Sequence, residues 1–508
     1  MPWFNLGILL LEGGRAAEAL DPLERAVALE ASVPEWLLAL GRAQALLDRH
    51  VAARETLERA IALVPDLAPA HEQLGLSLLA SGEPAQAVAA HRRAYELDPA
   101  SQSAASNYLL ALNYVPGMGV AAIFAEHRRW GAAFDGQAAK AHLNSRDPAR
   151  RLRIGYVSPD MKRHPVAYFL EPVLAHRDRS SFEVVAYSDT AREDEVSARL
   201  RGAVDHWRPV DALDNDALAA QIAADRIDLL VDLAGHTAGG RRLPVFARKP
   251  APVQAGWLGY LNTTGLSAID YRITDAHACP EGWERFHSEN VFRLPHSQWC
   301  AAEVGRPRTA ERSGARIVFG ALHNFAKVSG EVIAAWAGVL RGAPGSRLLL
   351  LVPGADQLRA SVSAKFAAAG IDPSRIDFSG RLSFDRYLSL HESIDVNLDA
   401  FPYTGGTTTC HSLWMGVPVV TLAGDTPASR GGASALRAVG LDELVADSVE
   451  QYVEIAAGLA REPVRLAALR AGLRSRVAAS PLADTRAFTR DLEAAYRQMW
   501  RRWCGAAG

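Results

Sequence analysis

Several features that define common protein classes are absent or rare in this sequence. Only 4 of its 508 residues are cysteines, and no two of them form a Cys-x-x-Cys pair. This spacing suits neither a zinc site nor a disulfide framework, so we expect a reducing, cytoplasmic compartment. No apolar run approaches the length of a membrane span, and the first residues lack the basic leader and cleavage site of a signal peptide. We therefore expect neither a membrane span nor a secretory signal.

The charge balance and the missing nucleotide motifs exclude further classes. The sequence has 55 lysines and arginines against 57 aspartates and glutamates, so nothing indicates a nucleic-acid partner. It contains neither a P-loop nor a Gly-x-Gly-x-x-Gly motif, which argues against kinases, GTPases and dinucleotide oxidoreductases. No Asp-x-Asp cluster follows a predicted strand, so we expect no nucleotide-bound metal and no cofactor.

What the sequence does contain is, first, an internal repeat in residues 1–116. The same residue types recur every 34 residues, in the pairs Leu6-Gly7, Leu40-Gly41 and Leu74-Gly75 and at Ala19, Ala53 and Ala87. This is the tetratricopeptide pattern, in which each repeat is a pair of antiparallel helices and small residues stand where the helices touch. Such an α-solenoid offers a groove for peptide or protein partners. A structural stalk or a dimerisation face is the alternative.

Strands and helices alternate after a helical connector at 117–150, and this alternation predicts parallel α/β layers. We expect one α/β unit at 151–305, a second at 306–480 and an amphipathic helix within 481–508. The predicted strands are 152–158, 182–188, 227–233 and 253–258 in the first unit, and 317–321, 347–352, 376–379, 396–398 and 417–422 in the second.

Polar loops follow the carboxyl ends of the predicted strands, where parallel sheets place their active groups. In the first unit these loops are 158–165 (SPDMKRHP), 235–240 (GHTAGG) and 259–265 (GYLNTTG). His164 precedes a proline, which favours an extended backbone and lets the imidazole point into a cleft as a donor or proton carrier. An ordinary loop histidine is the alternative for His164, and a structural histidine is the alternative for His236.

In the second unit, residues 395–430 read as a buried strand, a Pro/Gly turn and a helix that begins in a run of threonines. Hydroxyls and free backbone N–H groups at a helix start can hold a phosphate, and the glycines of the turn let the backbone approach it. The alternative is an ordinary strand–turn–helix with a threonine N-cap. Lys327 can neutralise a phosphate leaving group, or it is a solvated loop lysine. Tyr387 can lie on a nucleotide base, or it packs in the core.

Long motifs then support a resemblance to a known family. Besides the repeats, they are LRIGYVSPDMKRHP, DLAGHTAGG, KPAPVQAGWLGYLNTTG, YRITD, HNFAK, LDAFPYTGGTTT and GVPVVTL. In this order they resemble the O-linked N-acetylglucosamine transferases, including their SPINDLY branch, which transfers fucose. The resemblance implies a GT-B fold: two Rossmann-like lobes face each other across a cleft, and the C-terminal helix braces the first lobe. It also implies inverting, metal-independent transfer of a sugar from a nucleotide donor to Ser or Thr hydroxyls of proteins.

The resemblance also assigns roles to individual residues. His164 matches the family's active-site histidine, and Lys327 matches the lysine that stabilises the leaving diphosphate. The nucleotide-sugar contacts that it implies are Asn324, Arg381, Leu382, Tyr387, Gly406, Thr407, Thr408 and His411. On the acceptor side the candidates are His236, Thr263 and Thr264, from the second and third loops of the first unit.

Two positions depart from the N-acetylglucosamine pattern and leave the donor open. His411 stands where the family usually has a carboxylate for the ribose, and Gly406 stands where that branch often has a histidine. We expect UDP-N-acetylglucosamine as the donor and keep GDP-fucose as the alternative. A catalytically weak tetratricopeptide scaffold is a further alternative, from a different class of function.

Overall fold

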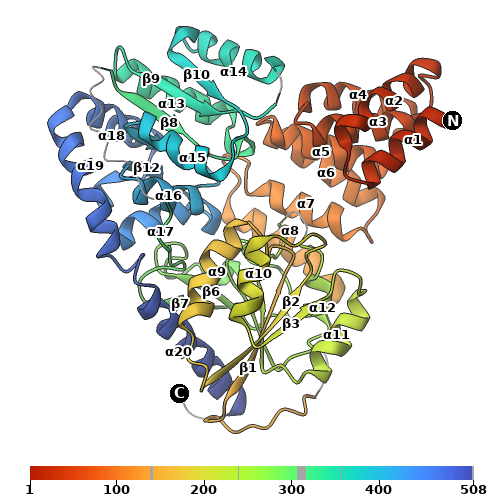
Figure 1. Ribbon diagram of the computed structural model, residues 1–508, viewed down its shortest axis with the longest axis vertical. Coiled ribbons are helices and arrows are strands. Elements are labelled where there is room, and N and C mark those ends of the chain that lie inside the picture. Colours follow the sequence, from red (N-terminus) through yellow and green to blue (C-terminus); the bar gives the residue numbers. More distant parts are fainter. Residues whose placement is uncertain (138–140, 238–239, 306–315, 355, 506–508) are drawn as a thin grey trace.

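The computed structural model describes residues 1–137, 141–237, 240–305, 316–354 and 356–505 (Figure 1). The chain forms a helical array, a connector, two α/β lobes and a long last helix. Five parts of the sequence predictions lie outside the described residues: 138–140 in the connector, 238–239 in the second loop, 306–315 at the start of the second lobe, 355 within that lobe, and 506–508 at the end. Among the described residues, no helix combines the length and the apolarity needed to cross a membrane.

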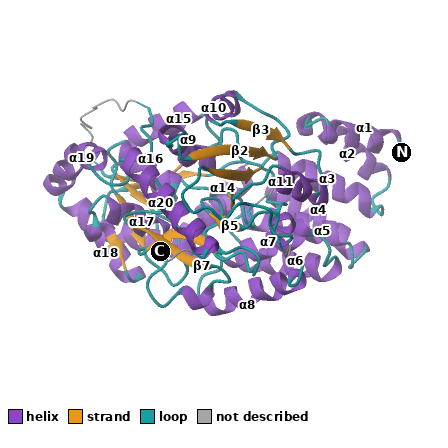
Figure 2. Ribbon diagram, turned by 90° about the horizontal axis from the view of Figure 1, so that it is seen from below, coloured by secondary structure: helices purple, strands orange, loops and turns teal. Residues whose placement is uncertain are grey.

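The N-terminal array is an α-solenoid in which consecutive helices pack on each other, and it stands to one side of the sheets (Figure 2). Its small residues have the role that the repeat predicts. A Cβ on Gly7 would lie 2.5 Å from the Leu23 side chain, and Ala19 and Ala53 are completely buried. The helices are α1 (Pro2–Glu12), α2 (Ala16–Leu29), α3 (Pro34–Leu46), α4 (His50–Leu63), α5 (Ala68–Ala80), α6 (Pro84–Leu97) and α7 (Gln102–Leu112).

The connector contains α8 (Val120–Gly131) and the 3-10 helix η1 (Ala132–Phe134). It packs closely on the first lobe, because a Cβ on Gly131 would lie only 1.9 Å from the carbonyl oxygen of Gly265. The Trp130 side chain is buried at this contact. The connector therefore joins the array to the first lobe through packing as well as through the chain.

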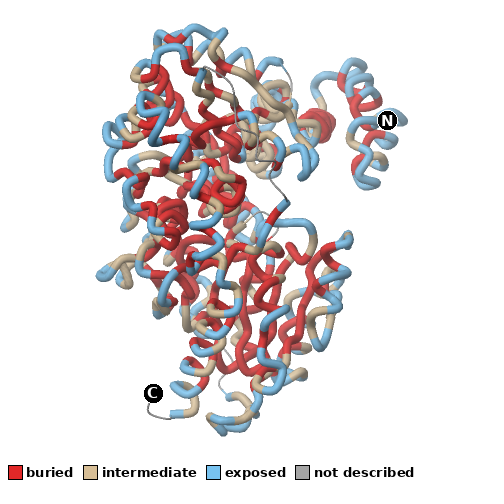
Figure 3. Tube along the Cα trace, turned by 60° about the vertical axis from the view of Figure 1, so that its left-hand side comes forward, coloured by how far each residue is buried: buried red, intermediate tan, exposed pale blue. Residues whose placement is uncertain are grey.

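The first lobe holds a parallel sheet in the order β3-β2-β1-β4-β5-β6-β7, whose inner strands are buried along most of their length (Figure 3). The order of β1 to β6 is the doubly wound Rossmann order. The strands are β1 (Leu152–Ser158), β2 (Phe182–Ser188), β3 (His206–Pro209), β4 (Leu229–Asp232), β5 (Val253–Gly256), β6 (Tyr271–Asp275) and β7 (Asn290–Leu294). The helices are α9 (Pro165–His176), α10 (Glu195–Ala203), α11 (Asn215–Ala224), α12 (Leu243–Ala247) and η2 (Glu284–Phe286).

The second lobe is also built on a parallel sheet, in the order β10-β9-β8-β11-β12-β13. Its strands are β8 (Val318–Ala321), β9 (Arg347–Leu351), β10 (Ile376–Ser379), β11 (Val396–Leu398), β12 (Val419–Leu422) and β13 (Val445–Ala446). Its α-helices are α13 (Gly330–Gly342), α14 (Asp356–Ala368), α15 (Phe384–Leu390), α16 (Thr407–Trp414), α17 (Gly431–Ala438), α18 (Val449–Arg461) and α19 (Pro463–Ala478). Its 3-10 helices are η3 (Phe325–Lys327), η4 (Pro373–Arg375), η5 (His391–Ser393), η6 (Pro427–Ser429) and η7 (Asp442–Leu444).

The last helix, α20 (Thr485–Cys504), follows the second lobe in sequence but packs on α9, β5 and β7 of the first (Figure 1). The Tyr496 hydroxyl lies 3.1 Å from that of Tyr156, and the Phe488 ring stacks on Trp257. The last helix therefore lies against the first lobe. The predicted fold class, an α-solenoid followed by two Rossmann-like lobes, is confirmed.

Candidate active site

A cavity of about 360 Å³ lies where α9 of the first lobe faces α15 and α16 of the second. We call it the cleft cavity. It contains five of the residues predicted from the sequence, from both lobes. Its lining residues are Arg163, His164, Pro165, Ala167, Tyr168, Glu171, Val196, Arg199, Phe384, Tyr387, Thr407, Thr408 and His411.

His164 reaches the cleft cavity from the N-cap position of α9, in the extended conformation that the following proline favours. Its Nδ1 accepts a hydrogen bond from the backbone N–H of Val166 at 3.3 Å and lies 3.6 Å from Oδ2 of Asp160. Burial and the nearby Lys162 lower the pKa of His164 to about 4. The ring is therefore neutral at pH 7, and since Nδ1 accepts, its proton is on Nε2. His164 can donate a hydrogen bond to a ligand.

The threonine run begins α16, as predicted, with Thr407 as its first residue and Gly406 as its N-cap. Steric crowding explains why position 405, two residues before the helix, is a glycine. A Cβ on Gly405 would lie 2.4 Å from Oγ1 of Thr409 and 2.9 Å from Oγ1 of Thr408. The first-turn N–H groups and two threonine hydroxyls therefore meet beside a turn that only glycine permits. This arrangement suits an anion.

Asp399 fixes this turn, and the sequence analysis did not single it out. Its side chain is fully buried at the end of β11. Its Oδ1 accepts from the backbone N–H of Gly405 at 2.7 Å, and its Oδ2 accepts from the Thr421 hydroxyl at 2.7 Å. Its place directly after a buried strand was the available signal.

His323 is a second residue that the sequence analysis missed. Its Nε2 lies 2.8 Å from the Leu398 carbonyl oxygen and therefore donates, which leaves Nδ1 to accept from the Thr408 hydroxyl at 3.2 Å. Like Asp399, it follows a buried strand, in this case β8. His323 and Asp399 therefore fix the geometry of the threonine turn through hydrogen bonds to Thr408 and to the Gly405 backbone.

Lys327 ends η3 and approaches the same turn. Its Nζ donates to the Thr404 carbonyl oxygen at 2.7 Å and lies 4.5 Å from the centre of the Tyr403 ring. Burial lowers the pKa of Lys327 to about 8, while the Asp399 carboxylate opposes this shift. The ammonium is still protonated at pH 7. Lys327 is not in the lining of the cleft cavity but lies against the turn that borders it.

An aromatic wall surrounds His411 in the cleft cavity. The imidazole meets the rings of Tyr168, Phe384 and Tyr387 edge to face, at centroid distances of 5.1, 5.5 and 5.7 Å. Burial lowers the pKa of His411 to about 3, so the ring is neutral. Within the described part of the chain, the two ring nitrogens of His411 and the Tyr387 hydroxyl are buried and have no hydrogen-bond partner.

Three predicted nucleotide contacts lie elsewhere. Arg381 is 76% exposed and forms an ion pair with Asp48 of the array, at 2.8 Å. Asn324 is exposed and caps η3 by accepting from the backbone N–H of Ala326 at 3.1 Å. Leu382 is partly buried and, like the other two, does not line the cleft cavity.

The three acceptor-side candidates are buried under the array and the connector. His236 lies between the Ser106 hydroxyl, 3.0 Å from Nδ1, and the Thr264 carbonyl oxygen, 2.9 Å from Nε2. The hydroxyls of Thr263 and Thr264 both donate to the Glu289 carboxylate. We therefore correct the prediction: these side chains are bound to structural partners and are not presented to an acceptor. For His236, the alternative of a structural histidine agrees with these contacts.

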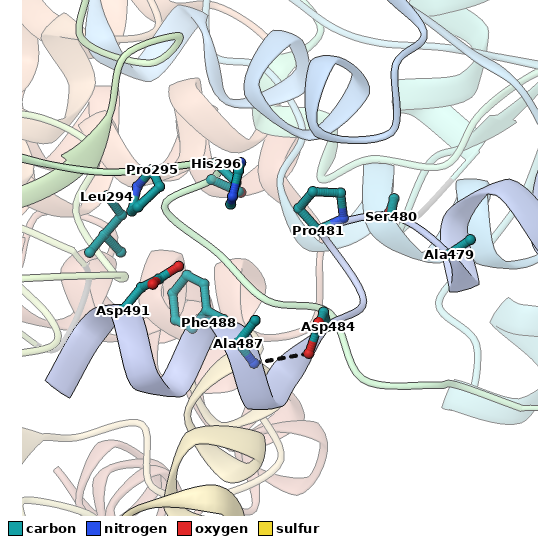
Figure 4. Close-up of a pocket in the computed structure, with 11 residues that line it drawn as sticks. Leu294, Pro295, His296, Ala479, Ser480, Pro481, Asp484, Ala487, Phe488 and Asp491 are labelled. Carbon is teal, nitrogen blue, oxygen red and sulfur yellow. Dashed lines mark hydrogen bonds between the residues drawn. The ribbon is translucent and has the colours of Figure 1, made fainter. Parts of the chain in front are cut away.

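A separate pocket of about 190 Å³ lies at the crossing from α19 to α20 (Figure 4). Its walls include His296 from the loop after β7 and Pro481, Phe488 and Asp491 from the crossing and α20. None of the predicted site residues lines it. The groups suited to bind an anion are gathered at the cleft cavity instead.

The comparison with known families accounts for this set of residues. The family model described as glycosyl transferase family 41 matches residues 136–303 and 309–492, which include both walls of the cleft cavity. The chain belongs to glycosyltransferase family 41. The resemblance to O-linked N-acetylglucosamine transferases inferred from the motifs is thereby confirmed.

Relatives in family 41 resemble the chain in sequence and in structure. It is 40% identical over 423 residues to a probable UDP-N-acetylglucosamine–peptide N-acetylglucosaminyltransferase SPINDLY of Petunia hybrida, a match covering 80% of this chain and 45% of the relative. It is 32% identical over 370 residues to the similarly named SEC protein of Arabidopsis thaliana, covering 70% of this chain and 38% of that one. The chain spans about half the length of the curated relatives it matches.

A solved family 41 structure matches the whole chain. It is a mutant of the Thermobaculum terrenum O-GlcNAc transferase, with a TM-score of 0.93 and 35% identity. The match covers 99% of this chain and 98% of that one. The array, both lobes and the returning helix therefore occur together in that protein as well.

Proposed function

We propose that this chain transfers N-acetylglucosamine from UDP-N-acetylglucosamine to serine and threonine hydroxyls of proteins, with inversion and without a metal. One observation carries the proposal. The threonine turn with Lys327 stands on one side of the cleft, and a neutral His164 stands on the other side of the same cavity. A diphosphate at the turn would place the sugar it carries between the lobes.

The leaving group sets the main chemical demand. Negative charge develops on the diphosphate as the bond between the sugar and its oxygen breaks. The first-turn N–H groups of α16, the threonine hydroxyls and the Lys327 ammonium would stabilise this charge without reorganising. These groups supply the positive potential that a metal supplies in other transferases, which is why we propose metal independence.

His164 is better suited to orient the reactants than to take the acceptor proton. Its ring proton on Nε2 makes it a donor toward the cavity, and its low pKa makes it a weak base. The acceptor hydroxyl loses its proton late, because its own pKa is far above neutral. We propose that His164 holds the donor sugar and the acceptor in line.

GDP-fucose is the second candidate donor. The chain is 40% identical to the SPINDLY relative but 32% identical to the SEC relative, and the fucose alternative belongs to the SPINDLY branch. His411, with both ring nitrogens unpaired, replaces the carboxylate expected at the ribose. Both relatives are named as UDP-N-acetylglucosamine–peptide N-acetylglucosaminyltransferases, which favours UDP-N-acetylglucosamine as the leading donor.

Protein acceptors and a cytoplasmic location complete the proposal. The helical array is of a kind that binds peptides along its groove, and it stands beside the two lobes (Figure 1). All four cysteines are free thiols, as a reducing compartment favours.

The donor can be tested by thermal unfolding with UDP, GDP, UDP-N-acetylglucosamine or GDP-fucose, each with and without EDTA. A ligand at one hundred times its Kd stabilises the folded state by about 2.7 kcal/mol. We expect a response to UDP and its sugar that EDTA does not change. A response to GDP alone would replace the donor with GDP-fucose, and no response to any of the four would favour a scaffold.

Transfer itself tests the role of His164. His164→Ala should lower turnover on a Ser/Thr peptide by about a hundredfold or more, as loss of a positioned catalytic histidine does. The melting temperature should fall only slightly, because the side chain is 39% exposed and the N-cap hydrogen bond that it accepts from the Val166 N–H is long, at 3.3 Å. His206→Ala is the control, since this histidine lies on the edge strand β3, outside the cleft lining. Near-normal transfer by His164→Ala would refute the assignment.

A further inference from the structure

The 3-10 helix that carries Lys327 is seated on the helical array. An apolar cluster joins the two parts, so that Ala326 of η3 packs among buried residues of the array and Tyr403 packs against the same cluster. The array residues of the cluster are Leu78, Leu79, Ala87, Ala90, Ala111 and Tyr114. The lysine proposed to meet the leaving group is therefore supported by the array as well as by its own lobe.

The backbones of the two parts are also in close contact. Gly82, in the loop between α5 and α6, has φ +77, and a Cβ there would lie 2.2 Å from the carbonyl oxygen of Val328. Val328 directly follows Lys327. A contact between backbones leaves little room for the end of η3 to move without the array.

Tyr403 lies at the centre of this contact, between the array and the lysine. Its ring stacks on Tyr114 of the array at a centroid distance of 4.7 Å and an interplanar angle of 24°. The Lys327 Nζ lies 4.5 Å from the centre of the same ring. The next carbonyl in the chain, that of Thr404, accepts the hydrogen bond from Nζ at 2.7 Å. The contacts thus run from the array through one aromatic ring to the ammonium.

We propose that Tyr403 is a positioning residue, whose ring, supported by Tyr114, holds the Lys327 ammonium at the threonine turn and couples the array to that site. The inference rests on the proposed function in one respect, that Lys327 meets the donor diphosphate. An aromatic face attracts a cation through its quadrupole, and the attraction strengthens when water is excluded. The ring favours the protonated lysine, whereas an aliphatic side chain of similar bulk does not.

Because only an aromatic ring attracts the cation, two substitutions can tell whether Tyr403 positions the ammonium or only fills space. Tyr403→Phe keeps the ring, and Tyr403→Leu keeps apolar bulk without the ring. The Tyr403 hydroxyl forms no hydrogen bond with another described residue, so Tyr403→Phe breaks no hydrogen bond within that part of the chain. Tyr114→Leu and Tyr114→Phe form the matching pair on the side of the array.

The experiment measures Kd for UDP and for GDP by calorimetry between pH 6.5 and 9.5, on the full chain. In the wild-type protein, affinity should fall as Lys327 loses its proton. Tyr403→Leu should weaken binding about tenfold at pH 7 and move the fall to lower pH, because the charged lysine loses its favoured contact. Tyr403→Phe should restore the wild-type profile. Tyr114→Leu should shift the profile in the same direction, and Tyr114→Phe should not.

The outcomes separate the two proposals. If the wild-type protein binds neither nucleotide, the proposed function fails, and this inference fails with it. If the wild-type protein binds and Tyr403→Leu keeps both the affinity and the profile, only the inference is overturned. An unchanged profile for Tyr114→Leu beside an altered one for Tyr403→Leu would overturn the coupling to the array. If Tyr403→Leu does not fold, Tyr403→Met takes its place.

Discussion

Burial sets the charge states of the side chains at the cleft. It lowers the pKa of His164 to about 4, that of His411 to about 3 and that of Lys327 to about 8. Near neutral pH these three groups are therefore two neutral imidazoles and one ammonium. The ammonium can offer its positive charge to the anionic part of a ligand.

The charge on Lys327 leads to a prediction about pH. Lys327→Met should weaken binding of the nucleoside diphosphate that the wild-type protein prefers by about 1.5–3 kcal/mol, the usual range for a hydrogen bond to a charged group. The loss should be large at pH 7, where the ammonium is protonated, and small at pH 9.5, above its pKa of about 8. Calorimetry at the two pH values measures the difference.

The matched control for this prediction is Lys365→Met. Lys365 pairs with Glu83 of the array at 2.8 Å and does not line the cleft. The Lys365→Met variant should bind the nucleoside diphosphate with the affinity of the wild-type protein at both pH values. A loss for Lys327→Met that is equal at pH 7 and pH 9.5 would contradict a role for the ammonium charge.

The contribution of Lys327 to folding stability depends on pH in the opposite direction to its contribution to nucleotide binding. Because the pKa of Lys327 is lower in the folded protein than in the unfolded chain, the unfolded chain binds more protons between about pH 8 and the ordinary value of 10.5. Stability from this group therefore rises with pH across that window, while nucleotide affinity falls. At neutral pH, keeping the Lys327 ammonium in its desolvated position therefore lowers the free energy of unfolding.

At the level of elements, the threonine turn shows how a strand end and a helix start combine. β11 and the start of α16 both follow from local pattern: a short apolar strand, then glycines and threonines. What fixes the turn is Asp399, which joins the Gly405 backbone to the Thr421 side chain on β12. The anion site is therefore a property of two neighbouring strands as well as of the helix.

Asp399→Asn tests this account. The amide keeps the shape of the carboxylate but removes its charge and replaces one acceptor by an NH2 donor, so either the Gly405 N–H loses its acceptor or the Thr421 hydroxyl must turn and accept instead of donating. We expect a loss of about 1.5–3 kcal/mol in the free energy of unfolding, because the group is fully buried. Nucleotide affinity should fall as well.

Urea unfolding and calorimetry measure the two effects of Asp399→Asn. Asp356→Asn is a suitable control, because this aspartate lies in the first turn of α14, away from the cleft lining. Its effect on both quantities should be small. Full stability of Asp399→Asn would show that the turn is held by other contacts.

The same comparison shows what the sequence could predict. β1, β2, β10 and β11 begin and end where the alternation of apolar residues predicts, because their patterns are local. β3, β6 and β7 are not evident in the sequence, since each is short or carries charged residues. Of the residues that the motifs single out, the structure brings five together at one cavity, namely His164, Tyr387, Thr407, Thr408 and His411.

The predictions that missed the cavity depend on distant partners. Arg381 pairs with an aspartate 333 residues earlier, and His236 bonds to a serine 130 residues earlier. Both partners are in the helical array. A local pattern cannot tell whether a polar loop residue faces a ligand or another domain, so these positions needed the tertiary structure.

At the level of the whole molecule, the array contacts both lobes. Ser106 and Asn113 bond to His236 and Tyr260 of the first lobe. Asp48 and Glu83 form ion pairs with Arg381 and Lys365 of the second. The array is thus a third body bound to both sides of the cleft, and its contacts include buried hydrogen bonds as well as exposed charge pairs. Exposed pairs contribute little to stability, so the buried contacts dominate this attachment.

The return of α20 ties the end of the chain to the segment just before β1, and Trp500 is the residue that tests this. Its side chain is completely buried, its indole N–H donates to the Asp147 carbonyl oxygen at 3.0 Å, and the Arg150 guanidinium lies 4.6 Å from its ring. Trp500→Ala should lower the free energy of unfolding by about 3–5 kcal/mol, as large cavities in cores do.

Trp503 offers the control on the same helix. It stacks on Trp500 at 4.7 Å but is only partly buried, so Trp503→Ala leaves a smaller, solvent-open gap and should cost clearly less. Denaturant unfolding of both variants measures the difference. If α20 braces the first lobe, the Trp500→Ala variant should also unfold its first lobe at lower denaturant than its second, because the helix packs on α9, β5 and β7. Equal effects of the two tryptophans would place the stabilising contact elsewhere on the helix.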